Sequence, residues 1–321
     1  MSTTNAVEVR LSPDDLNATL RADVRRGLTA TPKVLPPKYF YDARGSALFE
    51  EITRLPEYYP TGTERGLLTT HAPDVARLTS ARTLVELGSG SSEKTRLLLH
   101  ALSESLDCYV PVDVSESALA AAVAALGDEF PGLGVRGVVA DFEDLSQLPG
   151  EHPRLTAFLG GTIGNFEPTE RVRFLAEVAE GMRPGDSLLL GTDLVKDPTR
   201  LVAAYDDAAG VTAAFNLNVL SVMNRELGAD FDPSGFAHVA LWDAEREWIE
   251  MRLRSLRDQR VHVRELDLVV SFARGEEMRT EISAKFRRDG VAAELAAAGL
   301  SLAQWWTDPD GDFAISLATP A

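Results

Sequence analysis

Between residues 82 and 193, short runs of apolar and β-branched residues alternate with segments whose apolar residues recur every three or four positions. The first pattern predicts buried strands, and the second predicts amphipathic helices. The predicted strands are Thr83 to Leu87, Cys108 to Val112, Val135 to Ala140, Leu155 to Leu159 and Ser187 to Leu190. The predicted helices are Glu93 to Ser103, Glu116 to Phe130 and Thr169 to Met182. This alternation predicts a parallel sheet built from five β/α units.

The segments on either side of this region predict a second, interlocked domain. The N-terminal arm is too small to fold alone, and the stretch after the predicted sheet combines a long helical pattern with strand-like runs. The C-terminal end then predicts a helix and two strands joined by Asp308-Pro309-Asp310-Gly311, which suits a hairpin at the edge of the sheet. We expect one domain of residues 61–196 and 286–321 and another of residues 1–60 and 197–285.

Composition and charge exclude several classes of function. The 321 residues are 45% hydrophobic and 25% charged, as in an ordinary globular protein. The formal net charge of −17 would repel phosphate backbones and anionic lipids, so we expect no nucleic-acid and no membrane partner. Cys108 is the only cysteine, which excludes an intrachain disulfide and a thiolate-rich zinc site. We expect a cytoplasmic monomer that binds no metal.

A Gly-x-Gly turn, Gly88-Ser89-Gly90, follows the first predicted strand directly before a helix. Ligands bind at the carboxyl ends of parallel strands, and glycines let the backbone approach a ligand closely. The third glycine of a dinucleotide fingerprint is replaced by Glu93, and such a turn also occurs where nothing binds. Asp113, at the end of the second predicted strand, adds a carboxylate that can accept hydrogen bonds from both ribose hydroxyls of an adenosine.

Asp141 and Phe142 close the third predicted strand, where a carboxylate can bind the adenine amino group and a ring can cover the base. Three such features at three successive strand ends resemble the class I S-adenosylmethionine-dependent methyltransferases. The resemblance implies a Rossmann-like α/β sheet with a C-terminal antiparallel hairpin and an inserted α+β substrate-binding domain. It also implies that Gly88 contacts the methionyl part of S-adenosylmethionine and Lys94 its carboxylate. Asp113 would then bind the ribose, and Asp141 with Phe142 the adenine.

The end of the fourth predicted strand carries Asn165, whose side chain can orient the lone pair of an amine. The residues that follow, Phe166-Glu167-Pro168, depart from the Asn/Asp-Pro-Pro-aromatic tetrad of methyltransferases that act on DNA or protein amides. This departure favours a different acceptor.

A closer resemblance rests on several short stretches, which are Pro36 to Asp42, Leu55 to Pro60, Gly161 to Asn165, Gly191 to Asp197 and Thr280 to Phe286. They are similar to the histidine Nα-methyltransferases, which make the trimethyl betaine hercynine in the first step of ergothioneine biosynthesis. The resemblance implies that Tyr41 and Tyr205 bind the carboxylate of histidine. It assigns the amine to Asn165 and the Gly160 backbone, with Asn165 and Tyr41 as the catalytic residues.

The same resemblance implies that the imidazole of histidine is bound by Tyr58, Glu281 and Ser283, and that Met251 shapes the wall of the pocket. Alternation along a predicted strand places Glu281 and Ser283 on one face, as a shared ligand requires. Three alternatives remain open. The first is a methyltransferase of this fold that acts on another amino acid or an aromatic amine; the others are a nicotinamide-dependent oxidoreductase, which the incomplete glycine pattern disfavours, and an idle cofactor-binding scaffold.

Overall fold

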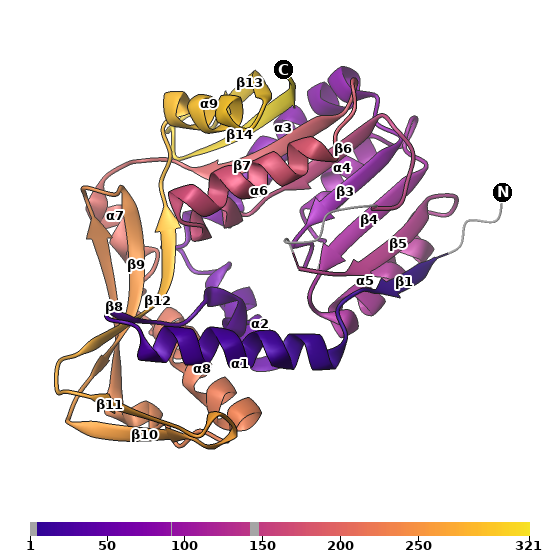
Figure 1. Cartoon of the computed structure of the whole chain (residues 1–321). Helices are drawn as coiled ribbons and strands as arrows, with labels where there is room; N and C mark the ends of the chain where they lie inside the picture. Colours follow the sequence, from indigo (N-terminus) through magenta and orange to yellow (C-terminus); the bar gives the residue numbers. More distant parts are fainter. Residues whose placement is uncertain (1–4, 91, 142–147) are drawn as a thin grey trace. The chain divides into compact units, whose positions relative to one another are not determined.

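The structure, a computed structural model, describes residues 5–90, 92–141 and 148–321. The chain divides into two compact units (Figure 1). The first unit contains Met1–Ser12, Gly62–Leu194 and Phe286–Ala321, and the second contains Pro13–Thr61 and Val195–Lys285. Both units are therefore built from segments that lie far apart in the sequence.

A mostly parallel sheet with the strand order β1-β5-β4-β3-β6-β7-β14-β13 forms the centre of the first unit. Its strands are β1 (Ala6–Val9), β3 (Thr83–Leu87), β4 (Cys108–Asp113), β5 (Gly134–Val139), β6 (Arg154–Phe158), β7 (Ser187–Asp193), β13 (Leu300–Thr307) and β14 (Phe313–Pro320). β14 pairs antiparallel with both β7 and β13. The predicted α/β sheet with a C-terminal antiparallel hairpin is confirmed.

Helices lie on both faces of this sheet (Figure 1). They are α3 (Tyr59–Thr79), which belongs to the first unit from Gly62 onward, α4 (Thr95–Ala101), α5 (Glu116–Glu129), α6 (Pro168–Glu180) and α9 (Arg288–Ala297). Leu68, Leu98 and Leu126, from α3, α4 and α5, share one buried apolar core with the central strands. All five residues of β3 are buried, which explains why continuous apolar runs in the sequence identified these strands.

The N-terminal strand β1 belongs to a different domain from the one expected from the sequence. The sequence predicts that residues 1–60 belong to the second domain, but Ala6–Val9 pairs in parallel with Arg136–Val139 of β5 in the first unit. Backbone hydrogen bonds with β5 hold this strand at the edge of the sheet. Because β1 is short and largely exposed, its residues carry little apolar signal from which the pairing could be predicted.

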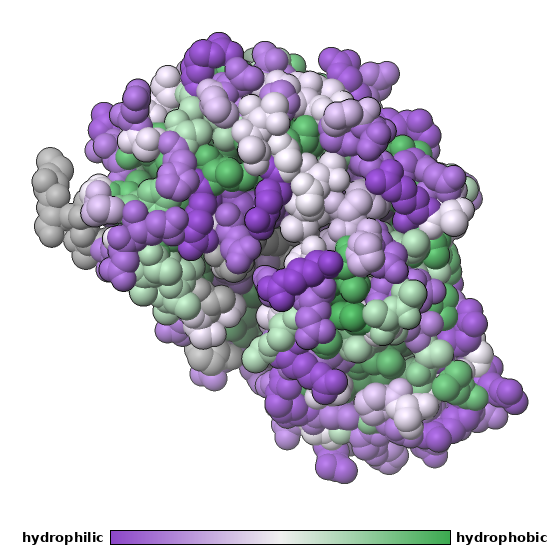
Figure 2. Space-filling view, turned by 180° about the vertical axis from the view of Figure 1, so that it is seen from behind, coloured by the Kyte–Doolittle hydropathy of each residue, from purple (hydrophilic) through white to green (hydrophobic). Residues whose placement is uncertain are grey.

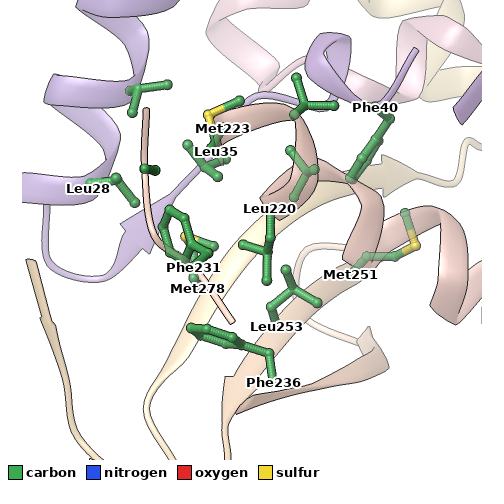
Figure 3. Close-up of a cluster of buried hydrophobic side chains, with 14 of the residues drawn as sticks. Leu28, Leu35, Phe40, Leu220, Met223, Phe231, Phe236, Met251, Leu253 and Met278 are labelled. Atoms are coloured by element: carbon green, nitrogen blue, oxygen red, sulfur yellow. The ribbon is translucent and has the colours of Figure 1, made fainter. Parts of the chain in front are cut away.

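A mixed sheet of order β2-β12-β9-β8 and a separate hairpin of β10 and β11 form the strands of the second unit. These strands are β2 (Lys33–Val34), β8 (Phe236–Asp243), β9 (Trp248–Ser255), β10 (Gln259–Val263), β11 (Leu268–Phe272) and β12 (Glu277–Ala284). The helices are α1 (Pro13–Thr29), α2 (Ala43–Ile52), α7 (Pro198–Ala203) and α8 (Val211–Leu227), with the 3₁₀ turn η1 (Pro37–Phe40). Figure 3 shows part of the core of this unit, in which Leu220 of α8 lies near Leu253 of β9 and Met223 of α8 lies near Leu35.

Hydrophilic residues cover most of the face shown in Figure 2, with smaller hydrophobic areas between them, as expected for a chain with a net charge of −17. None of the helices in the described ranges is both long and apolar enough to cross a membrane.

Candidate functional site

The glycine turn after β3 meets the end of β4 in the first unit. Gly88 and Gly90 have positive φ angles of 70° and 48°, a conformation that favours glycine. The Gly90 N–H donates to Asp113 Oδ2 at 3.0 Å, and the Ser115 N–H donates to Asp113 Oδ1 at 3.0 Å. The two amides fix the carboxylate, and each oxygen retains a second lone pair for another donor. The structure therefore brings together the turn and the acidic residue that the sequence identified separately.

Space for a ligand is left open at this turn. A Cβ atom built at Gly90 would meet none of the described atoms within 4 Å beyond its chain neighbours. The turn lies at the carboxyl edge of the sheet, where the strand order changes direction between β3 and β6. Doubly wound sheets bind their ligands at such a point. The residues present thus fit an adenosyl cofactor.

Asp141 follows β5, is half-buried and lies on the same edge of the sheet as Asp113. The Ala140 N–H beside it donates to the Asp113 carbonyl at 3.2 Å, which ties the ends of β4 and β5 together. Phe142, the predicted cover of the adenine, lies outside the described residues.

Lys94 directly precedes α4 and contacts a carboxylate that the sequence analysis did not identify. Its ammonium donates to Glu64 Oε2, and the Gly160 N–H donates to Glu64 Oε1 at 2.7 Å. The Glu64 side chain is fully buried, whereas that of Lys94 is 22% exposed. The sequence predicts that Lys94 binds a carboxylate of the cofactor. In the structure its ammonium already has one anionic partner within the protein, which is Glu64. A charged residue within the apolar face of α3 was the signal that could have identified Glu64.

A second buried carboxylate, Glu86, lies within β3. It accepts hydrogen bonds from the hydroxyls of Thr95 and Tyr109, and the Tyr109 hydroxyl is 2.9 Å from that of Ser92. Burial raises the pKa of Glu86 to about 7, while these hydrogen bonds and the Lys94 ammonium act in the opposite direction. An acidic residue in the middle of an apolar strand was visible in the sequence, but its partners on α4 and β4 were not.

The loop after β6 carries the residues expected to bind the acceptor amine. Gly160 and Gly161 have φ angles of 79° and 69° and lead into the 3₁₀ turn η2 (Thr162–Asn165). The Thr162 hydroxyl donates to the Leu159 carbonyl at 3.0 Å. Because Glu64 accepts from the Gly160 N–H, both polar groups of the Leu159–Gly160 peptide are engaged and its orientation is fixed. Asn165 ends η2 and is half-buried.

Aromatic side chains cluster in the second unit around three of the predicted residues. The ring of Tyr41 makes edge contacts with Phe49 and Phe215, each with centroids 5.6 Å apart. Tyr58 contacts Phe49 at 6.2 Å and Tyr205 at 6.3 Å, again edge to face. Tyr41 is 47% exposed whereas Tyr205 is buried, so this cluster runs from the surface of the unit into its core.

The strand β12 carries the other predicted residues of the second unit. Glu281 pairs with Met251 of β9, and Ser283 lies two residues further along β12 on the same face. The hydroxyls of Ser283 and Tyr205 are 2.7 Å apart, and the buried Lys285 ammonium donates to both, at 2.8 and 3.0 Å respectively. Lys285 was part of the family resemblance, but its contact with these two hydroxyls was not predicted.

The predicted residues thus fall into two groups. Gly88, Lys94, Asp113, Asp141, Gly160 and Asn165 belong to the first unit. Tyr41, Tyr58, Tyr205, Met251, Glu281 and Ser283 belong to the second unit. Within each unit, hydrogen bonds or ring contacts connect several members of the group, although these members are distant in the sequence.

One cluster of carboxylates in the described part of the chain has oxygens close enough together to hold a metal ion, and it consists of Asp308, Asp310 and Asp312. The Asp308 carboxylate accepts hydrogen bonds from the backbone N–H groups of Asp310, Asp312 and Phe313. These bonds are typical of an Asx turn, and they account for the aspartate that opens the β13–β14 connection.

Comparison with known proteins gives similarity along nearly the whole chain. A family model described as "Histidine-specific methyltransferase, SAM-dependent" matches residues 20–320. A histidine N-alpha-methyltransferase of Mycolicibacterium smegmatis is 58% identical over 96% of this chain and 97% of its own length. One of Mycobacterium tuberculosis is 56% identical over 98% of both chains. A solved S-adenosylmethionine-dependent methyltransferase from Clostridium acetobutylicum aligns at 10% identity and a TM-score of 0.46, over 79% of this chain and 90% of that one. The matched region of the family model includes residues of both units.

Proposed function

We propose that this chain, which belongs to the family of SAM-dependent histidine-specific methyltransferases, transfers three methyl groups to the α-amino nitrogen of free L-histidine and so forms hercynine. The observation that carries this proposal is the 56–58% identity, over at least 96% of the chain, to two proteins named histidine N-alpha-methyltransferase. A protein named "Ergothioneine biosynthesis protein 1" from Neurospora crassa, 30% identical over 86% of this chain and 32% of its own length, supports the same pathway. We therefore assign the reaction to the first step of ergothioneine biosynthesis.

The residues of the first unit are proposed to hold S-adenosylmethionine, which when bound supplies an electrophilic methyl group on a sulfonium. Asp113, already oriented by two backbone amides, would accept hydrogen bonds from the ribose hydroxyls. Asp141 and Phe142 would hold the adenine. The Gly88 backbone would lie against the methionyl part, and Lys94 would bind its carboxylate.

The amino acid substrate is proposed to be held by its three polar ends. Tyr41 and Tyr205 would donate to its carboxylate, and Asn165 with the Gly160 backbone would hold its amine. The Gly160 N–H is already used by Glu64, so we expect the Gly160 carbonyl to accept from that amine.

The imidazole of histidine has one donor and one acceptor nitrogen in its neutral form. Glu281 accepts from the ring N–H. The other nitrogen has a single lone pair, to which one hydroxyl, that of Tyr58 or that of Ser283, can donate. Met251, paired with Glu281 across the β9–β12 ladder, would supply an apolar wall. These side chains distinguish histidine from other amino acids in this proposal.

Methyl transfer needs a neutral amine, because an ammonium nitrogen has no lone pair with which to attack. Each transfer would form one N–C bond as the S–CH3 bond of the sulfonium breaks, with S-adenosylhomocysteine as the leaving group. Three protons leave the nitrogen in total if histidine arrives as its ammonium form. The amine subsite must accept the mono- and dimethyl intermediates as well. Asn165 suits this requirement, because its amide orients the nitrogen without adding a permanent negative charge.

Mass spectrometry of the purified protein incubated with S-adenosylmethionine and the twenty free amino acids tests the proposal. We expect a gain of three methyl groups on histidine alone. Methylation of a different amino acid would retain the cofactor site and overturn the assignment of Tyr58, Glu281 and Ser283. No methylation of any amino acid would overturn the proposed acceptor class.

The same proposal includes a monomeric enzyme that works in the cytoplasm without a nucleic-acid or membrane partner. The net charge of −17 supports the exclusion of polyanionic partners. Light scattering during size-exclusion chromatography tests the oligomeric state, and a mass of about twice 34.8 kDa would contradict it.

A further inference from the structure

Glu64 is a fully buried carboxylate that contacts two separate parts of the candidate site. One oxygen accepts from the Gly160 N–H at 2.7 Å, and the other accepts from the Lys94 ammonium. Removing a carboxylate from water is unfavourable unless charge and hydrogen bonds compensate. Here the Lys94 ammonium supplies the compensating charge and the Gly160 N–H supplies a hydrogen bond, so the burial of Glu64 depends on these two partners.

A glycine on the neighbouring strand makes room for this carboxylate. A Cβ atom at Gly191 of β7 would lie 2.2 Å from Glu64 Oε1 and 3.3 Å from a ring carbon of Phe313. Real Cβ atoms do not approach other atoms as closely as 2.2 Å, so any larger residue at position 191 would displace the carboxylate or the strand. The absence of a side chain at Gly191 therefore permits the contact between Glu64 and Gly160.

The two partners of Glu64 lie on opposite sides of the point where the strand order reverses. Lys94 follows the β3 turn, which the cofactor is proposed to occupy, and Gly160 follows β6 in the loop proposed for the acceptor amine. β3 and β6 are adjacent parallel strands. A Cβ atom at Gly160 would be only 3.6 Å from Lys94 Nζ, so the two partners are also close to each other.

We propose that Glu64 is a positioning residue that aligns the cofactor side of the site with the acceptor side. Its carboxylate holds the Lys94 ammonium where that ammonium can bind the cofactor carboxylate, and it fixes the peptide that leads to the Gly160 carbonyl. An ammonium has three donors, so Lys94 can bind Glu64 and a second carboxylate at once. Glu64 also offsets the unfavourable placement of a cation at the N-terminus of α4. This inference rests on the proposed roles of Lys94 and Gly160.

A pair of probes that differ in one part of the cofactor tests the cofactor side. S-adenosylhomocysteine carries the amino acid carboxylate, whereas 5′-methylthioadenosine lacks it. Measured by calorimetry, Glu64→Gln is expected to weaken S-adenosylhomocysteine binding about tenfold, the effect of one charge-assisted hydrogen bond, and to leave methylthioadenosine binding unchanged. Unchanged or tighter S-adenosylhomocysteine binding would overturn the proposal. Retained methylthioadenosine binding shows that the variant is folded.

A neighbouring surface pair provides the matched control. Glu93 and Arg65 join the same two segments as Glu64 and Lys94, but both side chains are more than half exposed. Glu93→Gln should leave the binding of both probes unchanged. Should Glu64→Gln fail to fold, Glu64→Asp keeps the charge, moves it by one methylene and is expected to show the same selective loss.

A double-mutant cycle separates failure of this inference from failure of the proposed function. Lys94→Met alone should weaken S-adenosylhomocysteine binding, and Glu64→Gln added to it should cause little further loss, because the two residues act as a pair. Full additivity would overturn the coupling. If the unaltered protein does not bind S-adenosylhomocysteine, the proposed function itself fails; if Lys94→Met weakens binding and Glu64→Gln does not, only the role of Glu64 fails.

The acceptor side has its own readout. Gln at position 64 retains an oxygen that can accept from the Gly160 N–H, whereas Ala does not. We expect Glu64→Gln to leave the KM for histidine within about twofold and Glu64→Ala to raise it severalfold beyond that, since the latter releases the Gly160 peptide. Equal KM values for the two variants would show that the hydrogen bond between Glu64 and Gly160 does not affect histidine binding.

Discussion

The hydroxyl oxygens of Tyr205 and Ser283 are 2.7 Å apart, although 78 residues separate them in the chain. The family resemblance assigns Tyr205 to the carboxylate of histidine and Ser283 to its imidazole. Their direct contact, with Lys285 donating to both, makes them one polar unit. A change in either residue should therefore alter how the other one binds the substrate.

We predict that Tyr205→Phe and Ser283→Ala each raise the KM for histidine severalfold, as expected for the loss of about 1 kcal/mol of hydrogen bonding. The double variant should lose less than the product of the two effects, because the partners are shared. Steady-state kinetics of the four proteins measures this coupling. Tyr39→Phe is a matched control, since the Tyr39 hydroxyl bonds Asp23 elsewhere in the second unit. Independent, multiplicative effects would show that the two hydroxyls do not act together.

Glu281→Ala should weaken histidine binding by roughly 1.5–3 kcal/mol, or about 10- to 150-fold, if a charge-assisted hydrogen bond to the imidazole is lost. Binding of S-adenosylhomocysteine should not change, because the cofactor residues belong to the other group. Isothermal titration with each ligand separates the two effects. Glu245→Ala, in the exposed turn after β8, removes a carboxylate from the same unit and should alter neither affinity. An unaltered histidine affinity in Glu281→Ala would exclude Glu281 from the site.

Asp113→Asn should weaken S-adenosylhomocysteine binding about tenfold or more, because the ribose hydroxyls lose a charged acceptor. The amide also places an N–H₂ group near Gly90 or Ser115, whose N–H groups now donate to the carboxylate. Calorimetry with S-adenosylhomocysteine measures the loss, and thermal unfolding without ligand checks the fold. Asp128→Asn, exposed on α5 of the same unit, should behave like the unaltered protein. If Asp113→Asn bound S-adenosylhomocysteine as tightly as the unaltered protein does, a residue other than Asp113 would bind the ribose.

The features that depend on short stretches of chain were predicted most reliably from the sequence. β3 is buried along its whole length, so its apolar run marked it, and the glycine turn and Asp113 could be located from the strands they follow. Contacts between distant segments could not be predicted in this way. Glu64 and Gly160 are 96 residues apart, and no periodicity links them. β1 was missed for a different reason. Three of its four residues are exposed and Val7 alone among the four packs against the apolar core, so the strand carries little apolar pattern.

Glu86 predicts a specific pH dependence of stability. Burial raises its pKa from 4.5 to about 7 in the folded protein, so between these values the folded state binds more protons than the unfolded state. The contribution of Glu86 to stability is therefore fully present below about pH 4.5 and is lost as the pH rises through 7. The shift corresponds to a change on the order of 3 kcal/mol in the free energy of unfolding.

Glu86→Gln cannot ionise and should lack this contribution, so the difference in unfolding free energy between the two proteins should change across this window. Urea denaturation at pH 5, 6, 7 and 8 measures it, and the unaltered protein should lose stability relative to the variant with each step upward. Glu93→Gln, a surface carboxylate on the same connection, should instead run parallel to the unaltered protein. A constant difference between Glu86→Gln and the unaltered protein from pH 5 to 8 would mean that Glu86 titrates outside this range. The Thr95 and Tyr109 hydroxyls that donate to the Glu86 carboxylate, together with the Lys94 ammonium, would then outweigh its burial.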